Sequence, residues 1–247
     1  MFRLLRRRPW LSLTAAVLLF FAGSCAILTL PLTTRQGVNY RVTAYRIPAY
    51  VKTIDFLQRH YQYRLLVSRI CEGRKSDVDC VMAIFDWTHT NILPTPAGWP
   101  IVDDHPLNIV IRGYGKADQM ADVFATLSVY AGVPAFFEFV EDPSRRAVLP
   151  LAFAHLEGRW IPFDVEHHVV FRDRQGRLAS VEDLVTDPAW VDRAGGDVRP
   201  SGLPYSTFIS AKNLRPFVVP HPLRSELQQP WPRVRYEVRR AVGLERE

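Results

Sequence analysis

The sequence predicts an α+β domain, with helices packed on an antiparallel sheet, behind an N-terminal transmembrane helix. Three observations indicate this architecture. Residues 9–34 carry no charged side chain. Between residues 49 and 131, apolar residues recur at helical spacing in three segments. From residue 136 to residue 171, short apolar runs alternate with turn residues, as in antiparallel strands.

Length and composition favour one domain with an appendage. The chain has 247 residues, of which 48% are apolar, and this excludes an intrinsically disordered protein. The net charge of +6 comes from 31 basic and 25 acidic residues. Four of the arginines precede residue 9, and without them the balance is 27 against 25. The excess of positive charge therefore lies at the N-terminus, where it indicates the orientation of the chain in a membrane. We expect no nucleic-acid partner.

The first 34 residues are predicted to form a signal anchor. A helix over this uncharged run is long enough to cross a bilayer core of ~30 Å. The preceding arginines favour a cytoplasmic N-terminus, which puts the domain on the periplasmic side of the inner membrane. The membrane is then a partner through residues 10–32. A cleaved signal peptide ending near Ala22-Gly-Ser24, or a lipid anchor on Cys25, is the alternative, and each of these also exports the domain.

Two of the three cysteines stand close together in the sequence. Cys71 and Cys80 flank eight residues that are mostly polar. In an oxidising compartment they are candidates for a disulfide that closes a short loop. Two reduced, buried thiols are the alternative. No second Cys/His pair stands at zinc spacing, so we expect no metal site here.

The remaining chain divides by pattern into three parts. Residues 35–48 are predicted to be a linker or an edge strand, residues 49–185 the domain, and residues 186–247 an irregular extension ending in a short helix. Within the domain we expect helices over 49–70, from Ser76 onward and over 116–131, then strands over 136–140, 147–156, 159–164 and 169–171. Residues 93–112, rich in proline and glycine, are predicted to form a loop. The basic terminal helix over 233–242 is interpreted as a solvated face rather than a contact with anionic membrane.

Three motifs in the domain occur in a recognisable order. Gly115-Lys-Ala117-Asp-Gln-Met-Ala121 starts a helix, Gly132-Val-Pro-Ala135 ends it, and Gly158-Arg-Trp160-Ile-Pro-Phe-Asp164 forms a turn and a strand. This order and spacing, over roughly residues 76–170, resembles the transglutaminase-like superfamily of the papain-like cysteine fold. The resemblance implies a catalytic triad with cysteine at the helix start, histidine on the second strand and aspartate at the end of the third.

The catalytic residues that the resemblance implies are mostly absent. The cysteine position is Ala117, and the histidine position falls near Leu149 with the family's tryptophan position near Leu151. Only the aspartate remains, as Asp164. Acyl transfer needs a thiolate activated by an imidazole, and neither alanine nor leucine can replace these groups. The sequence therefore predicts a degenerate member of the superfamily, a pseudoenzyme.

Several other residues are candidates for the former cleft. They are polar, glycine or aromatic residues of the motifs and of the preceding loop: Asp104, His105, Gly115, Asp118, Gln119, His155, Trp160 and Asp164. His155 is the one histidine on the second strand. It is close to the turn at Glu157-Gly158, so we interpret it as a partly exposed strand residue rather than a base.

The leading hypothesis is a catalytically inactive binding or scaffolding module of the bacterial cell envelope, which accepts an extended peptide or glycan and needs no cofactor. One alternative is a hydrolase with metal-assisted chemistry. Asp103, Asp104, His105 and Asp164 would supply its ligands, with Glu166, His167 and His168 nearby. A second alternative is a cysteine peptidase or acyltransferase, if the triad positions lie elsewhere.

Overall fold

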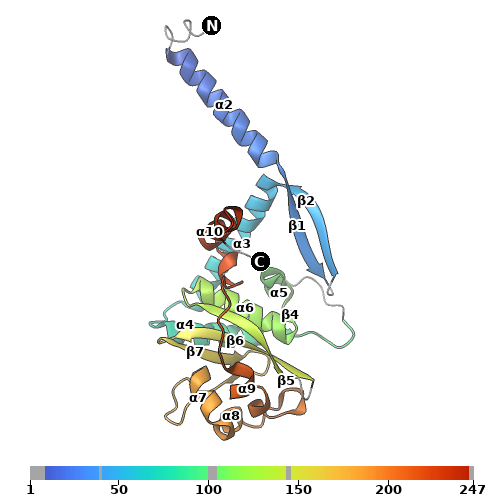
Figure 1. Cartoon of the computed structure of the whole chain (residues 1–247), viewed down its shortest axis with the longest axis vertical. Coiled ribbons are helices and arrows are strands. Elements are labelled where there is room, and N and C mark those ends of the chain that lie inside the picture. The colour runs from blue at the N-terminus through green and yellow to red at the C-terminus, as the bar shows by residue number, and fades with distance from the viewer. Residues whose placement is uncertain (1–8, 39–40, 100–104, 143–145, 245–247) are drawn as a thin grey trace. The chain divides into compact units, whose positions relative to one another are not determined.

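The structure is a computed structural model that describes residues 9–38, 41–99, 105–142 and 146–244. The chain separates into two compact units, residues 1–58 and 59–247. The first contains helix α2 (Pro9–Thr29) and the antiparallel pair β1 (Pro31–Val38) and β2 (Arg41–Pro48). Helix α3 (Ala49–Ile70) begins in the first unit and ends in the second. The second unit holds the predicted α+β domain (Figure 1).

The prediction of a transmembrane helix is wrong. Helix α2 does form over the uncharged run, but no helix in the described part of the chain is long and apolar enough to cross a membrane. The single-pass localisation is therefore wrong as well, whereas a membrane contact through residues 10–32 stays a prediction. The error has a physical cause, because absence of charge is a weaker criterion than apolarity. Ser12, Thr14, Gly23 and Ser24 are uncharged but contribute little to transfer into lipid.

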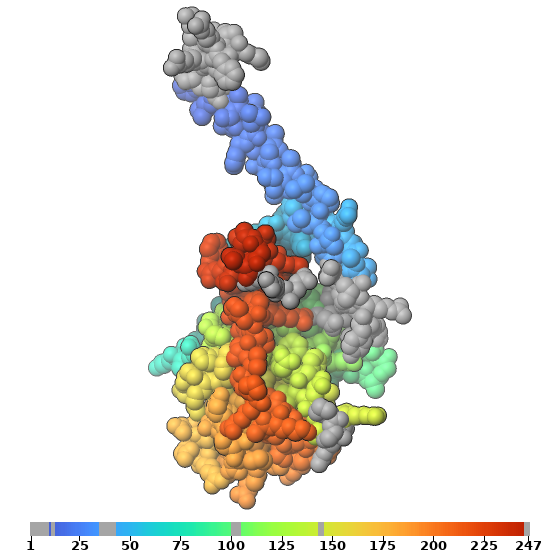
Figure 2. Space-filling model, viewed as in Figure 1, coloured from blue at the N-terminus to red at the C-terminus, as the bar shows by residue number. Residues whose placement is uncertain are grey.

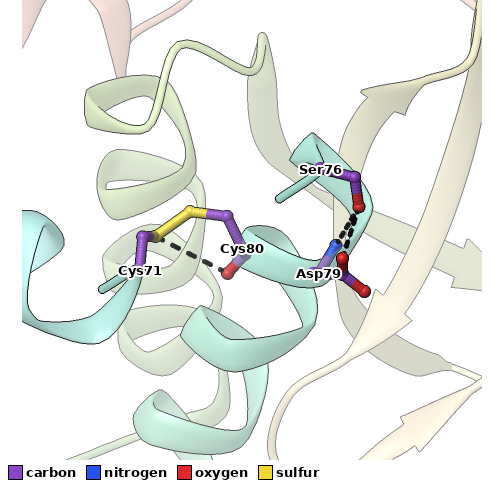
Figure 3. Close-up of a disulfide and its surroundings, with 4 residues drawn as sticks. All are labelled: Cys71, Ser76, Asp79 and Cys80. Atoms are coloured by element: carbon purple, nitrogen blue, oxygen red, sulfur yellow. Dashed lines mark hydrogen bonds between the residues drawn. A yellow bond between two sulfur atoms is a disulfide. The ribbon is translucent and has the colours of Figure 1, made fainter. Parts of the chain in front are cut away.

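A disulfide joins the two helices that open the domain. Cys71, just after α3, is bonded to Cys80 in α4 (Asp77–Asn91), and Figure 3 shows the bond beside the start of α4. Ser76 caps this helix, since its hydroxyl oxygen accepts a hydrogen bond from the Asp79 N–H at 3.1 Å. The same hydroxyl donates to the Asp79 carboxylate at 2.8 Å. The cap and the cross-link together fix where α4 starts.

The predicted loop before the third helix contains regular structure. Residues 93–94 (β3) pair in parallel with residues 114–115 (β4), and helix α5 covers Pro106–Arg112. Pro106 occupies the first helical turn, where its missing N–H is not needed. Proline and glycine thus mark the boundaries of this short helix, which buries Leu107 and Ile109.

A four-stranded antiparallel sheet follows helix α6 (Ala117–Tyr130). Its strands are β5 (Ala135–Asp142), β6 (Ala147–Leu156), β7 (Arg159–Asp164) and β8 (Val169–Val170), in that spatial order. On one face, Ala152, Ala154 and Phe163 belong to a core shared with α4 and α6. Alternate residues of the strands point to opposite faces, so the sheet has a second buried face.

The C-terminal segment covers that second face. It contains α7 (Val181–Thr186), α8 (Pro188–Ala194), α9 (Ala211–Leu214) and short 3-10 turns at 200–202, 205–207 and 226–228. Leu149, Leu151 and Phe153 of β6 pack with Val181, Tyr205 and other residues of this segment in a separate core. Figure 1 shows the sheet between α6 and the group α7–α9. The chain after α9 runs along the surface to α10 (Pro230–Ala241), as Figure 2 shows.

Candidate functional site

The start of helix α6 is held by packing and by a polar network. A Cβ atom on Gly115 would lie 3.1 Å from the Ile109 side chain and 3.3 Å from that of Gln119, so a side chain here would require these neighbours to shift by a few tenths of an ångström. The buried Gln119 side-chain oxygen accepts hydrogen bonds from the Lys116 N–H at 3.1 Å and from Arg112 at 2.8 Å. Gln119, a predicted cleft residue, therefore serves to position the helix start.

Ala117 is the first residue of α6 and lines a hollow of about 520 Å³. The other lining residues come from the segment after β3, the turn before α6 and the chain after β7: residues 94–99, Gly115, Lys116, Asp118 and Glu166. The size suits a small molecule or a few residues of an extended chain. The structure thus places the methyl group of Ala117 in the wall of an open hollow.

Two carboxylates and one ammonium group give this hollow its charge. Asp118 and Glu166 line it together with the exposed Lys116. Burial raises the pKa of the Glu166 carboxyl, and the negative charges of Asp164 and Asp118 raise it further, whereas His167 lowers it. Trp99 is 54% exposed at the rim and packs edge-to-face on Tyr114, with 5.1 Å between ring centroids.

Asp164, the last residue of β7, has hydrogen-bond partners on both carboxylate oxygens. Its side chain is 1% exposed. One oxygen accepts a hydrogen bond from the Tyr205 hydroxyl at 2.7 Å, and the same oxygen lies 2.9 Å from Nδ1 of His167. The other accepts from the His167 backbone N–H at 3.1 Å. The carboxylate thus joins the end of β7 to the C-terminal segment and to the turn that follows β7.

The contact with Asp164 changes the pKa of the His167 imidazole. The hydrogen bond to Asp164 raises the pKa of His167, and the nearby carboxylates of Asp164 and Glu166 add to the rise against the opposing effect of burial. The carboxylate–imidazole contact is the arrangement that orients a general base in hydrolases. However, His167 is not among the residues that line the hollow at Ala117.

Leu149 and Leu151 lie in the second core and not in the hollow. Leu149 pairs with Val140 of β5, and both leucines are nearly inaccessible, at 3% and 0% exposure. The last pair between β6 and β7 is Ala152 with Phe163, so Leu151 is the next residue of β6 at the level of Asp164. The two leucines are parts of the packing that holds the C-terminal segment.

His155 and Trp160 form a pair at the other end of the hairpin. They are opposite each other in the register of β6 and β7, with ring centroids 5.0 Å apart. Trp160 also packs on Phe136 and Phe217. Because Asp164 is the last residue of β7, this pair belongs to a different end of the sheet from Asp164.

The residues of the metal alternative have other roles where the structure describes them. Asp103 and Asp104 lie outside the described residues. The ring nitrogen of His105 accepts a hydrogen bond from the Leu107 N–H at 3.3 Å and caps α5. His168 bonds to Asp86 at 2.9 Å and stacks on His89. Among the described residues, no group of three or more His, Cys, Asp or Glu side chains could hold a metal ion.

Glu166 and Tyr205 are site residues that the sequence analysis did not identify in these roles. Glu166 follows the motif that ends in Asp164 by two residues, and this short spacing is the feature of the sequence that could have indicated its place at the site. No local signal marks Tyr205, which lies 41 residues beyond Asp164. Its partner becomes visible only once the C-terminal segment is folded against the sheet.

Comparison with known proteins assigns no family to this chain. No family model and no curated protein sequence matches the chain. Two solved structures resemble it. "A Putative Cysteine Protease from Cytophaga hutchinsonii" has 18% identity and a TM-score of 0.37, over 56% of this chain and 53% of that one. "A Putative Protease from Parabacteroides distasonis" has 13% identity and a TM-score of 0.32, over 53% and 35%.

These likenesses are too weak, at TM-scores of 0.37 and 0.32, to carry an argument about the fold or the role of this chain. The chain spans about half the length of the first structure and about a third of the second. Residue roles in this chain therefore rest on its own geometry.

Proposed function

We propose that this chain is a non-catalytic binding protein that holds an extended ligand in the hollow at the start of α6. The proposal is supported by the observation that Ala117 lines the hollow, because the family resemblance assigns a cysteine to this position. A methyl group supplies no nucleophile, but it leaves room for a ligand at a helix start. Leu149 and Leu151, at and beside the histidine position, are buried elsewhere.

The chemistry of the hollow favours a peptide over a glycan of acidic sugars. Asp118 and Glu166 outnumber Lys116, so a ligand with a basic side chain gains charge complementarity. Trp99 supplies exposed apolar surface at the rim. The expected ligand is an extended peptide segment that carries lysine or arginine.

Fluorescence anisotropy with labelled peptide pools tests this proposal. Pools of extended nonapeptides enriched in lysine and arginine are compared with pools enriched in aspartate and glutamate. The full chain is expected to bind the basic pools and to release them at high salt, because screening weakens exposed charge pairs. Glu166→Gln should weaken binding several-fold, whereas Glu182→Gln, an exposed carboxylate on α7, should not. Equal binding of both pools would contradict the proposal.

A hydrolase is the second candidate function, because Asp164 holds the His167 ring at 2.9 Å. In this reading His167 would activate water as a general base. Its position outside the lining of the hollow argues against it. Mass spectrometry of the same pools after prolonged incubation distinguishes the two functions. Cleavage products that vanish in His167→Ala would favour the hydrolase. Products that vanish after thiol alkylation would favour a cysteine peptidase. Because the proposed binding protein does not cleave its ligand, we expect the peptides to remain intact.

A further inference from the structure

Helix α10 presents an apolar stripe that the other described residues of its own unit, residues 59–244, leave exposed. Trp231, Val234 and Val238 of α10 follow one another at intervals of three and four residues, so they lie on one side of the helix, and Val242 comes four residues later at its C-terminal cap. Their exposed fractions are 69%, 51%, 57% and 63%. Single exposed apolar residues are common on protein surfaces, but four in register on one helix mark an interaction surface.

The helix is attached mainly at its N-terminal end. The Tyr130 hydroxyl donates to the Gln228 carbonyl at 2.8 Å, and the Gln229 side chain donates to the Val129 carbonyl at 3.0 Å. None of the 12 residues of α10 is buried. A helix of this length is marginal in water unless packing of an amphipathic face stabilises it. A partner on the apolar stripe would supply that packing.

Charge on α10 determines which partner fits. The helix carries four arginines and one glutamate, a net charge of 4 − 1 = +3. Arg233 pairs with Glu237 at 2.8 Å. Arg235 and Arg239 stand one turn apart beside the stripe and line a hollow of about 380 Å³ with Trp231 and Tyr236. Arginine side chains that border an apolar surface favour carboxylates on the opposing surface.

We propose that α10 is the docking site for an acidic amphipathic helix of another protein. The apolar side of that helix packs on Trp231, Val234 and Val238, and its flanking carboxylates meet Arg235. Helix-in-groove recognition uses apolar anchors at this spacing. A second copy of the same chain fits less well, because two α10 helices would each bring a charge of +3 to the contact. This inference is independent of the function proposed for the hollow at Ala117.

The test uses two synthetic amphipathic helical peptides of 18 residues and the full chain. Both peptides have a leucine stripe at intervals of three and four residues. One carries glutamate on the flanks and the other carries lysine. By fluorescence anisotropy, we expect the glutamate peptide to bind and the lysine peptide to bind at least about tenfold more weakly. Hydrogen exchange in residues 230–241 should slow when the glutamate peptide is added.

Variants on the stripe and matched variants elsewhere decide whether α10 is the site. Val234→Ser with Val238→Ser, and separately Arg235→Glu, should each weaken binding about tenfold or more. Val218→Ser, at another exposed valine, and Lys212→Glu on α9 should leave the affinity for the glutamate peptide unchanged. The proposal is overturned if the stripe variants bind as the parent does, or if both peptides bind equally. It is also overturned if the full chain self-associates through α10 or if anionic vesicles compete for it more strongly than the glutamate peptide.

Discussion

The Tyr205 hydroxyl donates a hydrogen bond to the Asp164 carboxylate across 2.7 Å, and both side chains are buried. Asp164 ends strand β7, whereas Tyr205 lies in the segment that covers the second face of the sheet. The resemblance of the sequence to the transglutaminase-like superfamily implies that an aspartate at this position orients a histidine on the neighbouring strand. Here the same position fastens the C-terminal segment to the sheet.

Removal of that hydroxyl should destabilise the domain. Tyr205→Phe keeps the ring but leaves the buried carboxylate with one fewer donor. We expect a loss of about 1.5–3 kcal/mol, as for hydrogen bonds to charged groups. Urea unfolding followed by circular dichroism measures it, with Tyr61→Phe, at an exposed ring, as the control. An unfolding midpoint equal to that of the parent would show that the bond does not hold the segment.

We expect that Gly195 does not tolerate a side chain, because it lies against the ring of Tyr205. A Cβ atom there would contact Cδ2 of the Tyr205 ring and would lie 2.8 Å from Cε2. Gly195→Ala should cost about 1–3 kcal/mol through overpacking. If the ring is the cause, the penalty should shrink when Tyr205→Leu is the background. A penalty of the same size in both backgrounds would place the cause elsewhere.

The Asp164–His167 contact predicts a dependence of stability on pH. The pKa of His167 is raised above its ordinary value of 6.5 in the folded protein, chiefly by the hydrogen bond to Asp164. Protonated His167 therefore stabilises the fold, fully below the unfolded pKa and progressively less as pH rises through the folded pKa. We expect the parent to exceed His167→Asn in unfolding free energy at about pH 5.5 and the difference to shrink by about pH 8.5. A difference that grows with pH would contradict this assignment.

The cross-link between Cys71 and Cys80 should contribute measurably to stability. Its sequence separation is nine residues. On the chain-entropy account, closing such a loop contributes roughly 2–3 kcal/mol. Cys71→Ser with Cys80→Ser should lower the free energy of unfolding, measured in urea, by a matching amount. Dithiothreitol should lower the free energy of unfolding of the parent but not that of the variant. Insensitivity of the parent to reductant would contradict the prediction.

The sequence predicts most of the local structure of the domain. Gly115 and Gly132 bracket α6, Ser76 caps α4, and the turn at Glu157-Gly158 sets the register of β6 and β7. These features follow from short-range rules of capping, periodicity and turn chemistry. Helix α5 was missed, because proline and glycine signal the ends of a short helix as readily as they signal a loop.

The features that could not be predicted from the sequence depend on contacts between segments that are distant in the chain. Tyr205 reaches Asp164 across 41 residues, and no local pattern encodes that partner. Leu149 has the apolar character of a strand residue on either face of a sheet, so its burial under α7–α9 was not predictable. The error at α2 differs in kind, because it treated an uncharged segment as a sufficiently apolar one.

The central claim is that the hollow at Ala117 binds a ligand without reacting with it. Ala117→Trp tests it most directly, because the bulky ring would fill the hollow at its wall. In anisotropy titrations with the basic peptide pool, we expect this variant to lose binding by about tenfold or more while its urea midpoint stays close to that of the parent. Undiminished binding by Ala117→Trp, or cleavage of the bound peptides by the parent chain, would contradict the claim.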